Sequence, residues 1–183
     1  MKVIPALFID DERYPPDSPK ILYGNPACPP RAWDWPQLRE YLSKMDGIDA
    51  ASLMSAKAFL TDQKCYLTLG EHIWVWQRAV SSQAAIEQLQ QTGCPGLISF
   101  DHDLGGDDTA RTVVQWMINQ DLDTGFIPDD FEFRVHSQNP VGAQFIQQTL
   151  TRYLAFRAQE KQVVLGQHKQ PKNTTESLKK GLK

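Results

Sequence analysis

Short apolar runs alternate along the chain with longer segments whose apolar residues recur at helical spacing. Ala6–Ile9, Leu97–Phe100 and Phe131–Val135 are typical of buried strands, and each run ends in charged or polar residues. The patterns that predict helices lie over 81–91, 109–120 and 140–159. Strands that alternate with helices of this length predict an α/β fold, in which a parallel sheet is flanked by helices.

Polar residues mark where two of these helices should begin. Asp107 or Asp108 is placed to cap the second helix. Asn139 is placed to cap the last long helix, with Pro140 at its first position. After this helix, the apolar run Val163–Leu165 is predicted to be a last short strand.

The segment over about residues 14–72 interrupts this alternation. Its first prolines exclude a regular helix directly after the first strand. Farther along, the pattern predicts helices over 37–44 and 51–60, followed by a possible hairpin of two strands. We therefore expect a single domain over residues 1–165, with a large, partly helical insertion that is a lid over the site, a partner surface or a specificity element.

Composition is that of a soluble globular protein, but the charge is unevenly distributed. The 183 residues are 41% hydrophobic and 22% charged, with a formal net charge of −3. Residues 166–183 carry five Lys against one Glu, so this tail holds +4 and the rest of the chain −7. The tail is expected to be disordered. The net charge itself does not indicate a nucleic acid or a membrane as partner.

No feature directs the chain to a membrane or to an oxidising compartment. Its first apolar run is broken by Pro5 and followed at once by acids, unlike a signal peptide. No stretch reaches the roughly 18–20 apolar residues that a membrane span needs. Cys28, Cys65 and Cys94 are isolated, and their odd number argues against a disulfide framework. We expect a soluble cytoplasmic protein; the sequence gives no oligomeric state.

Three strand-like runs end in side chains that bind metals or transfer protons. In chain order these are Asp10-Asp11, Asp101-His102-Asp103 and His136-Ser137. Ligands of open parallel sheets bind beyond the carboxyl ends of the strands, so these groups should lie at one edge. Carboxylates that meet there repel one another unless a cation offsets their charge, and hard oxygen ligands suit Mg²⁺. The sequence therefore predicts an acidic site for a divalent metal and a phosphate.

Each group also has an ordinary structural interpretation. Asp residues after strands often cap the next helix, although the prolines that follow Asp11 disfavour this for the first pair. His102 and His136 are either hydrogen-bonded structural residues or the acid and base that break a P–O bond, because the histidine pKa lies near neutrality. Gly105-Gly106 is either a tight turn with positive φ or backbone that approaches an anion.

The three strand ends lie within longer motifs. These are LFIDDER over Leu7–Arg13, ISFDHDLG over Ile98–Gly105 and VHSQNPVG over Val135–Gly142. Together they resemble the cyclic-phosphate processing receiver domain family, over about residues 5–13 and 74–152. The resemblance implies a receiver-like, flavodoxin-like α/β fold, related to the receiver domains of two-component signalling.

The resemblance also implies roles for the residues of the site. Asp10 and Asp11 would match the acidic metal-binding pair of a receiver, and Asp101 its phospho-accepting residue; together they would hold Mg²⁺ or Mn²⁺. Ser137 would match the hydroxyl residue after the fourth strand of a receiver. The residues that this sequence itself suggests as phosphate contacts are Arg13, Gly105, Gly106, Ser137 and Asn139. A signalling receiver also has a Lys after its fifth strand. Only Lys169 could serve here and it matches poorly, which disfavours phospho-relay.

Three functions follow from these residues. The first is an enzyme that opens a cyclic phosphate on an RNA end or a nucleotide. Its catalytic residues would be Asp101, His102, Asp103 and His136. His102, Asp103 and His136 resemble additions that are proper to the cyclic-phosphate group. The second is a binding module controlled by phosphorylation of Asp101. The third is a non-catalytic binder of a cyclic nucleotide or an RNA end, in which the basic tail contacts phosphates.

Overall fold

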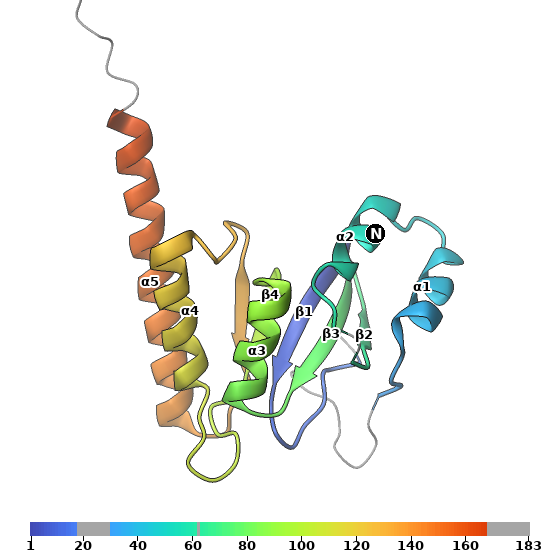
Figure 1. Cartoon of the computed structure of the whole chain (residues 1–183), viewed down its shortest axis with the longest axis horizontal. Helices are drawn as coiled ribbons and strands as arrows, with labels where there is room; N and C mark the ends of the chain where they lie inside the picture. Colours follow the sequence, from blue (N-terminus) through green and yellow to red (C-terminus); the bar gives the residue numbers. More distant parts are fainter. Residues whose placement is uncertain (18–29, 62, 168–183) are drawn as a thin grey trace, which may run out of the picture. The chain divides into compact units, whose positions relative to one another are not determined.

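A sheet of four parallel strands and one antiparallel edge strand forms the centre of the protein (Figure 1). This computed structural model describes residues 1–17, 30–61 and 63–167. The strands are β1 Val3–Ile9, β2 Tyr66–Leu69, β3 Ile73–Ala79, β4 Leu97–Phe100 and β5 Glu132–Val135. Their spatial order is β2-β3-β1-β4-β5, and β2 is the antiparallel hairpin partner of β3. The predicted receiver-like α/β class is confirmed, with a mixed sheet.

The helices, in chain order, are α1 Trp35–Ser43, α2 Ala50–Lys57, α3 Ser82–Thr92, α4 Arg111–Thr124 and α5 Pro140–Gln167. None of the helices in the described ranges is long and apolar enough to cross a membrane. The chain divides into two compact units, Met1–Thr149 and Leu150–Lys183. In the second unit the described part is helical, and the rings of Tyr153 and Phe156 lie 6.5 Å apart. The site lies within the first unit.

Two local predictions were wrong. Val163–Leu165 is not a strand, because α5 continues through it to Gln167. No turn residue separates this apolar run from the helix-forming residues before it. Neither Asp107 nor Asp108 caps α4, which begins after Ala110 without a side-chain cap. Asp108 Oδ2 instead accepts from the backbone N–H of Ser82 at 2.8 Å, at the start of α3.

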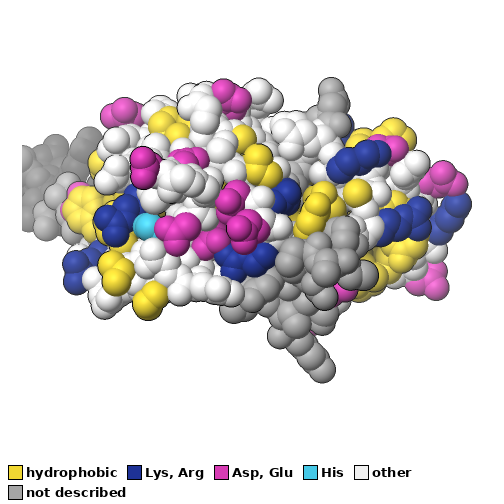
Figure 2. Space-filling model, turned by 90° about the horizontal axis from the view of Figure 1, so that it is seen from below, with side chains coloured by type: hydrophobic (Ala, Val, Ile, Leu, Met, Phe, Trp, Pro, Cys, Tyr) yellow, Lys and Arg dark blue, Asp and Glu magenta, His cyan; other side chains and the backbone are white. Residues whose placement is uncertain are grey.

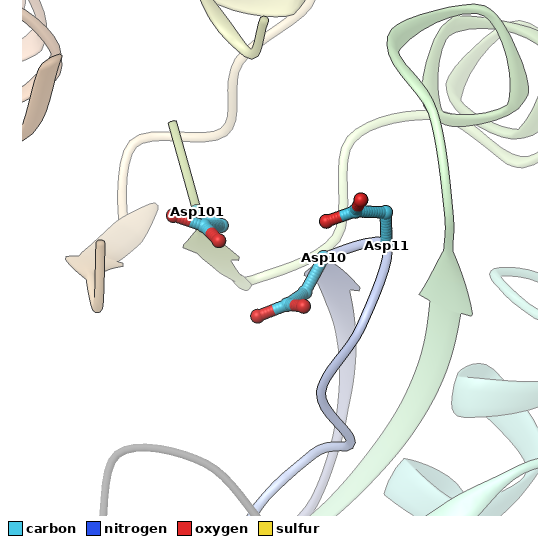
Figure 3. Close-up of side chains that lie close together, drawn as sticks. All are labelled: Asp10, Asp11 and Asp101. Carbon is cyan, nitrogen blue, oxygen red and sulfur yellow. The ribbon is translucent and has the colours of Figure 1, made fainter. Parts of the chain in front are cut away.

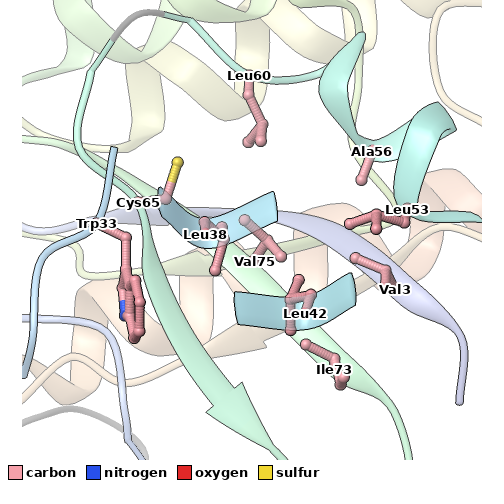
Figure 4. Close-up of a cluster of buried hydrophobic side chains, with 10 residues drawn as sticks. All are labelled: Val3, Trp33, Leu38, Leu42, Leu53, Ala56, Leu60, Cys65, Ile73 and Val75. Carbon is pink, nitrogen blue, oxygen red and sulfur yellow. The ribbon is translucent and has the colours of Figure 1, made fainter. Parts of the chain in front are cut away.

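Residues 14–72 contribute to the main core, so the expectation of an insertion is not confirmed. Leu38 and Leu42 of α1 and Leu53 of α2 are buried against Val3 and Val75 of the sheet (Figure 4). Burial of each such side chain contributes roughly 1.5–3 kcal/mol. The predicted helices of this segment and the hairpin are therefore structural parts of the domain. The basic tail from residue 168 on lies outside the described residues.

Strand register brings the candidate site residues to one face of the sheet. Phe8 of β1 lies beside Ser99 of β4. Side chains alternate along a strand, so Asp10 and Asp101, each two residues farther on, project from the same face. Asp10, Asp101 and His136 each donate their backbone N–H to the neighbouring strand, which holds the three strand ends side by side.

Candidate functional site

Three carboxylates from two strand ends lie together at the carboxyl edge of the sheet (Figure 3). Asp10 and Asp11 follow β1 and Asp101 follows β4; one ligand oxygen of each lies within 4.8 Å of the others. Asp10 is fully buried, Asp101 is 7% exposed and Asp11 is half-buried. Hard oxygen donors at this spacing suit a divalent cation. The structure thus brings together the three residues that were expected to hold a metal.

Arg13 lies against two of these carboxylates. Its Nε donates to Asp10 Oδ2 at 2.6 Å, its Nη2 donates to Asp101 Oδ2, and its Nη1 donates to the carbonyl of His136 at 3.1 Å. Burial alone would lower the pKa of Arg13, but Asp10 and Asp101 outweigh it and raise that pKa above its ordinary value. Arg13 is placed as a counter-cation inside the acidic cluster, and its expected contact with phosphate stays a prediction.

The hydrogen bonds of Asp10 keep it ionised despite its burial. Oδ1 accepts from the backbone N–H groups of Glu12 at 2.9 Å and Arg13 at 2.6 Å. Burial would raise the pKa of Asp10, but hydrogen bonds from His136 and Arg13 hold it below its ordinary value. Among the described residues, Asp11 has no partner for its carboxylate. The three carboxylates could therefore hold a metal ion, and two of them also contact Arg13.

His136 is buried, and both of its ring nitrogens have partners. Nε2 lies 2.9 Å from Asp10 Oδ2 and Nδ1 lies 2.8 Å from Ser99 Oγ. The ring stacks on Phe8, with centroids 4.4 Å apart. Burial lowers the pKa of His136, although the hydrogen bond to Asp10 acts in the opposite direction. A neutral ring that donates to Asp10 and accepts from Ser99 satisfies both of these hydrogen bonds.

His102 belongs to a chain of three hydrogen-bonded side chains. Arg111 Nε donates to His102 Nε2 at 3.1 Å, and His102 Nδ1 lies 2.7 Å from Asp103 Oδ1. Arginine can only donate, so Nε2 is the acceptor and Nδ1 carries the proton that bonds Asp103. This bond lowers the pKa of Asp103, which is itself exposed.

The first turn of α5 completes the surroundings of His102. Asn139 Oδ1 accepts from the backbone N–H of Gly142 at 3.0 Å, which confirms the predicted cap. Asn139 Nδ2 donates to Asp103 Oδ2 at 3.1 Å. A Cβ atom on Gly142 would lie 2.1 Å from Cγ of His102, so only glycine allows this approach.

Gly105 and Ser137 have structural contacts in the site, and Gly106 belongs to the turn beside it. The glycines have φ of 86° and 57°, which confirms the tight turn. A Cβ atom on Gly105 would lie 3.1 Å from Asp11 Oδ2, so the missing side chain leaves room for that carboxylate. Ser137 Oγ accepts from the backbone N–H of Asn139 at 3.2 Å. Whether any of the three contacts phosphate stays a prediction.

Sequence reasoning did not find three residues of this region. A sequence signal for Ser99 did exist, because it is a polar residue inside an apolar strand and lies two positions before Asp101, on the same face. Arg78 and Arg111 gave no such signal. Arg78 Nη2 donates to the backbone carbonyl of Asp11 at 2.6 Å, on the β3 side of the cluster.

Viewed from the side to which the strands point, acidic side chains gather with Lys or Arg on either side and a histidine nearby (Figure 2).

A family model, the cyclic-phosphate processing receiver domain, matches residues 6–152. The chain belongs to this family. The matched range includes 14–72, in agreement with the place of that segment in the core. Comparison with curated proteins and with solved structures gave no match.

The family membership explains the strand order. A flavodoxin-like sheet has the strand order 2-1-3-4-5, counted along its own chain. Here the neighbouring strands β3, β1, β4 and β5 correspond to strands 2, 1, 3 and 4 of that order. After β5 the described residues contain α5 and no further strand. The signalling Lys that would follow a fifth strand has no described counterpart, since Lys169 lies outside the described residues. The cation at Asp101 is instead Arg13, from the loop after β1.

Proposed function

We propose that this protein binds a divalent cation and hydrolyses the ring of a cyclic phosphate, carried by an RNA end or a nucleotide. The observation that carries the proposal is the hydrogen-bonded series of side chains Arg111, His102 and Asp103. His102 and Asp103 directly follow Asp101 of the acidic cluster in the sequence. Carboxylates alone suit a receiver that accepts phosphate. An imidazole oriented by a carboxylate adds a group for proton transfer beside them.

In this proposal the acidic cluster prepares the phosphate for attack. Asp10, Asp11 and Asp101 would hold Mg²⁺ or Mn²⁺, which would draw charge from the phosphoryl oxygens. Arg13 would offset part of the remaining negative charge. His136 would position Asp10, because its Nε2 bonds that carboxylate of the metal cluster and its Nδ1 bonds Ser99. The acid–base work is assigned to His102, because the carboxylate that orients its ring, Asp103, is not one of the three in the metal cluster.

His102 would act as the base. Its Nε2 takes a proton from water, and the water oxygen forms a bond to phosphorus. The bond between phosphorus and one ribose oxygen breaks, and that oxygen takes a proton from solvent. The product is a phosphate monoester, and the imidazolium then returns its proton to solvent. Asp103 holds Nδ1–H throughout and stabilises the charged ring.

Incubation with Mg²⁺ or Mn²⁺ and a 2′,3′-cyclic nucleotide tests this proposal, with ring opening followed by phosphorus NMR. His102→Gln should reduce the rate about 10²–10⁴-fold, the usual contribution of a positioned base. The control is His72→Gln, since His72 is exposed and outside the site. No ring opening by the wild-type protein, or an unchanged rate in His102→Gln, would sink the proposal. Tight binding of an unaltered nucleotide would instead indicate a non-catalytic binder.

The contact between Arg13 and Asp101 favours a second candidate function. A cation beside the phospho-accepting position is what the Lys of a signalling receiver supplies, so Asp101 could accept a phosphoryl group. The surfaces of α3 and of the first turns of α5 would then meet a partner. Acetyl phosphate with Mg²⁺ should add one phosphoryl mass to the wild-type protein and none to Asp101→Asn. Absence of that mass would count against this candidate.

A further inference from the structure

Arg111 is a cation of the site that has no carboxylate partner in the described part of the chain. It is the first residue of α4 and is half-buried. Nε donates to His102 Nε2 at 3.1 Å, and the guanidinium carbon lies 4.3 Å from the ring centre of Phe145. Both partners are neutral groups, and together they hold the guanidinium on two sides.

The two arginines at His102 and at the acidic cluster differ in how their charge is balanced. Arg13 is paired with Asp10 and Asp101. The guanidinium of Arg111 is partly removed from water, and the groups that replace water around it are an imidazole and the face of a phenyl ring. A desolvated charge is unfavourable without a counter-charge. Its Nη1 and Nη2 make no hydrogen bond to any described residue. This is the condition in which a guanidinium gains most from an anion.

We propose that Arg111 is the phosphate-binding residue of the site. Its Nη1 and Nη2 form a planar pair of donors that matches two oxygens of a phosphate ester. The identification of the ligand as a phosphate ester rests on the proposed function. Arg13, named for this role from the sequence, is already committed to two carboxylates.

Phosphate binding by Arg111 also acts on His102. The Nε–H that His102 Nε2 accepts belongs to the same guanidinium that would turn toward the anion. When the guanidinium shifts to the phosphate, Nε2 loses this donor and is available to water. The base is therefore prepared only when a phosphate is in place.

Calorimetric titration with inorganic phosphate, and with a 2′,3′-cyclic nucleotide in the absence of metal, tests this inference. Arg111→Gln should bind both anions at least about tenfold more weakly, or about 1.4 kcal/mol. Arg111→Lys, which keeps the charge without the two-point geometry, should lie between Arg111→Gln and wild type. Arg39→Gln is the control, because Arg39 is exposed on α1 and should bind as wild type does. Equal affinities of Arg111→Gln and Arg39→Gln would overturn the inference.

A measurement on the wild-type protein covers the case in which Arg111→Gln does not fold. Inorganic phosphate should shift the NMR signal of the Arg111 Nε–H, identified as the signal missing from Arg111→Lys, whereas chloride at equal ionic strength should not. No shift at saturating phosphate overturns the inference. Ring opening with unaltered anion binding by Arg111→Gln would overturn this inference alone. Anion binding that depends on Arg111, without ring opening by wild type, would overturn the proposed function alone.

Discussion

Gly142, in the first turn of α5, lies directly against the ring of His102. A Cβ atom at this position would stand 2.1 Å from Cγ and 2.3 Å from Cδ2 of the imidazole. The ring is buried and held at both nitrogens, by Arg111 and Asp103, so it has little room to withdraw. The absence of one side chain on α5 therefore fixes where the proposed base lies.

Gly142→Ala should destabilise the protein by about 1–3 kcal/mol, the usual effect of overpacking. It should also separate His102 from Asp103, because either the imidazole ring or helix α5 must move to make room for the new methyl group. Urea unfolding measures the first effect, and the imidazole NMR signals of His102 measure the second. Gln144→Ala, at an exposed position of the same helix, is the control. Wild-type stability in Gly142→Ala would show that the close approach is not present in solution.

Substitutions of Asn139 should separate its two hydrogen-bonding roles. Asn139→Ala removes the cap of α5 and should cost about 1 kcal/mol, whereas Asn139→Ser keeps a capping oxygen and should cost much less. Both variants lose the donor to Asp103, so both should slow ring opening. Urea unfolding and the phosphorus NMR assay provide the two readouts. A variant Asn139→Ser as unstable as Asn139→Ala would contradict the assignment of the cap.

Arg13→Gln should make stability depend on metal. Removing the guanidinium leaves Asp10 and Asp101 without their counter-charge, and breaking a buried ion pair costs about 3–5 kcal/mol. Mg²⁺ or Mn²⁺ should therefore raise the melting temperature of Arg13→Gln more than that of the wild-type protein. Scanning fluorimetry with and without each metal measures the difference, with Arg39→Gln as control. An equal response in all three proteins would rule out competition between Arg13 and the metal.

His136 should make the protein less stable in mild acid. Burial lowers its pKa below the ordinary 6.5, so the native state favours the neutral ring. Below pH 6.5 the unfolded chain binds the proton more readily than the native protein does, and the free energy of unfolding falls as the pH decreases. At lower pH, protonation of Asp10, whose pKa is also lowered, adds to this loss.

Urea unfolding across this pH range measures the effect. His136→Gln should flatten the decline below pH 6.5, because it removes the group that titrates there. His72→Gln, at an exposed position, should retain the wild-type slope. A slope in His136→Gln as steep as in the wild-type protein would assign the acid sensitivity to other groups.

The sequence predicted those features that depend on local patterns. Leu97–Phe100 is a strand with the predicted bounds, and the convergence of Asp10, Asp11 and Asp101 follows from the geometry of parallel strands. The sequence could not show which partner each side chain takes. Arg13 turns inward to two carboxylates because their combined burial favours it, and that choice depends on strands far apart in the sequence.

Two other results depended on tertiary context. The segment over 14–72 looked like an addition, because its prolines and short helices broke the α/β pattern, yet its leucines complete the core. His136 and His102 both follow strand ends and both are buried, but His136 stacks on Phe8 and bonds Asp10, whereas His102 bonds Asp103. Alternation along the strands placed His136 beside Asp10, but only the packed structure showed which partners each ring nitrogen takes.

The ion pairs of Arg13 with Asp10 and Asp101 affect how the protein would behave when metal is scarce. Because a guanidinium already balances Asp10 and Asp101, we expect the chain to stay folded without an inorganic ion. A chelator should therefore silence the site while the chain stays folded, and resupply of the ion should restore it without refolding. Metal supply would then act as a reversible off-switch.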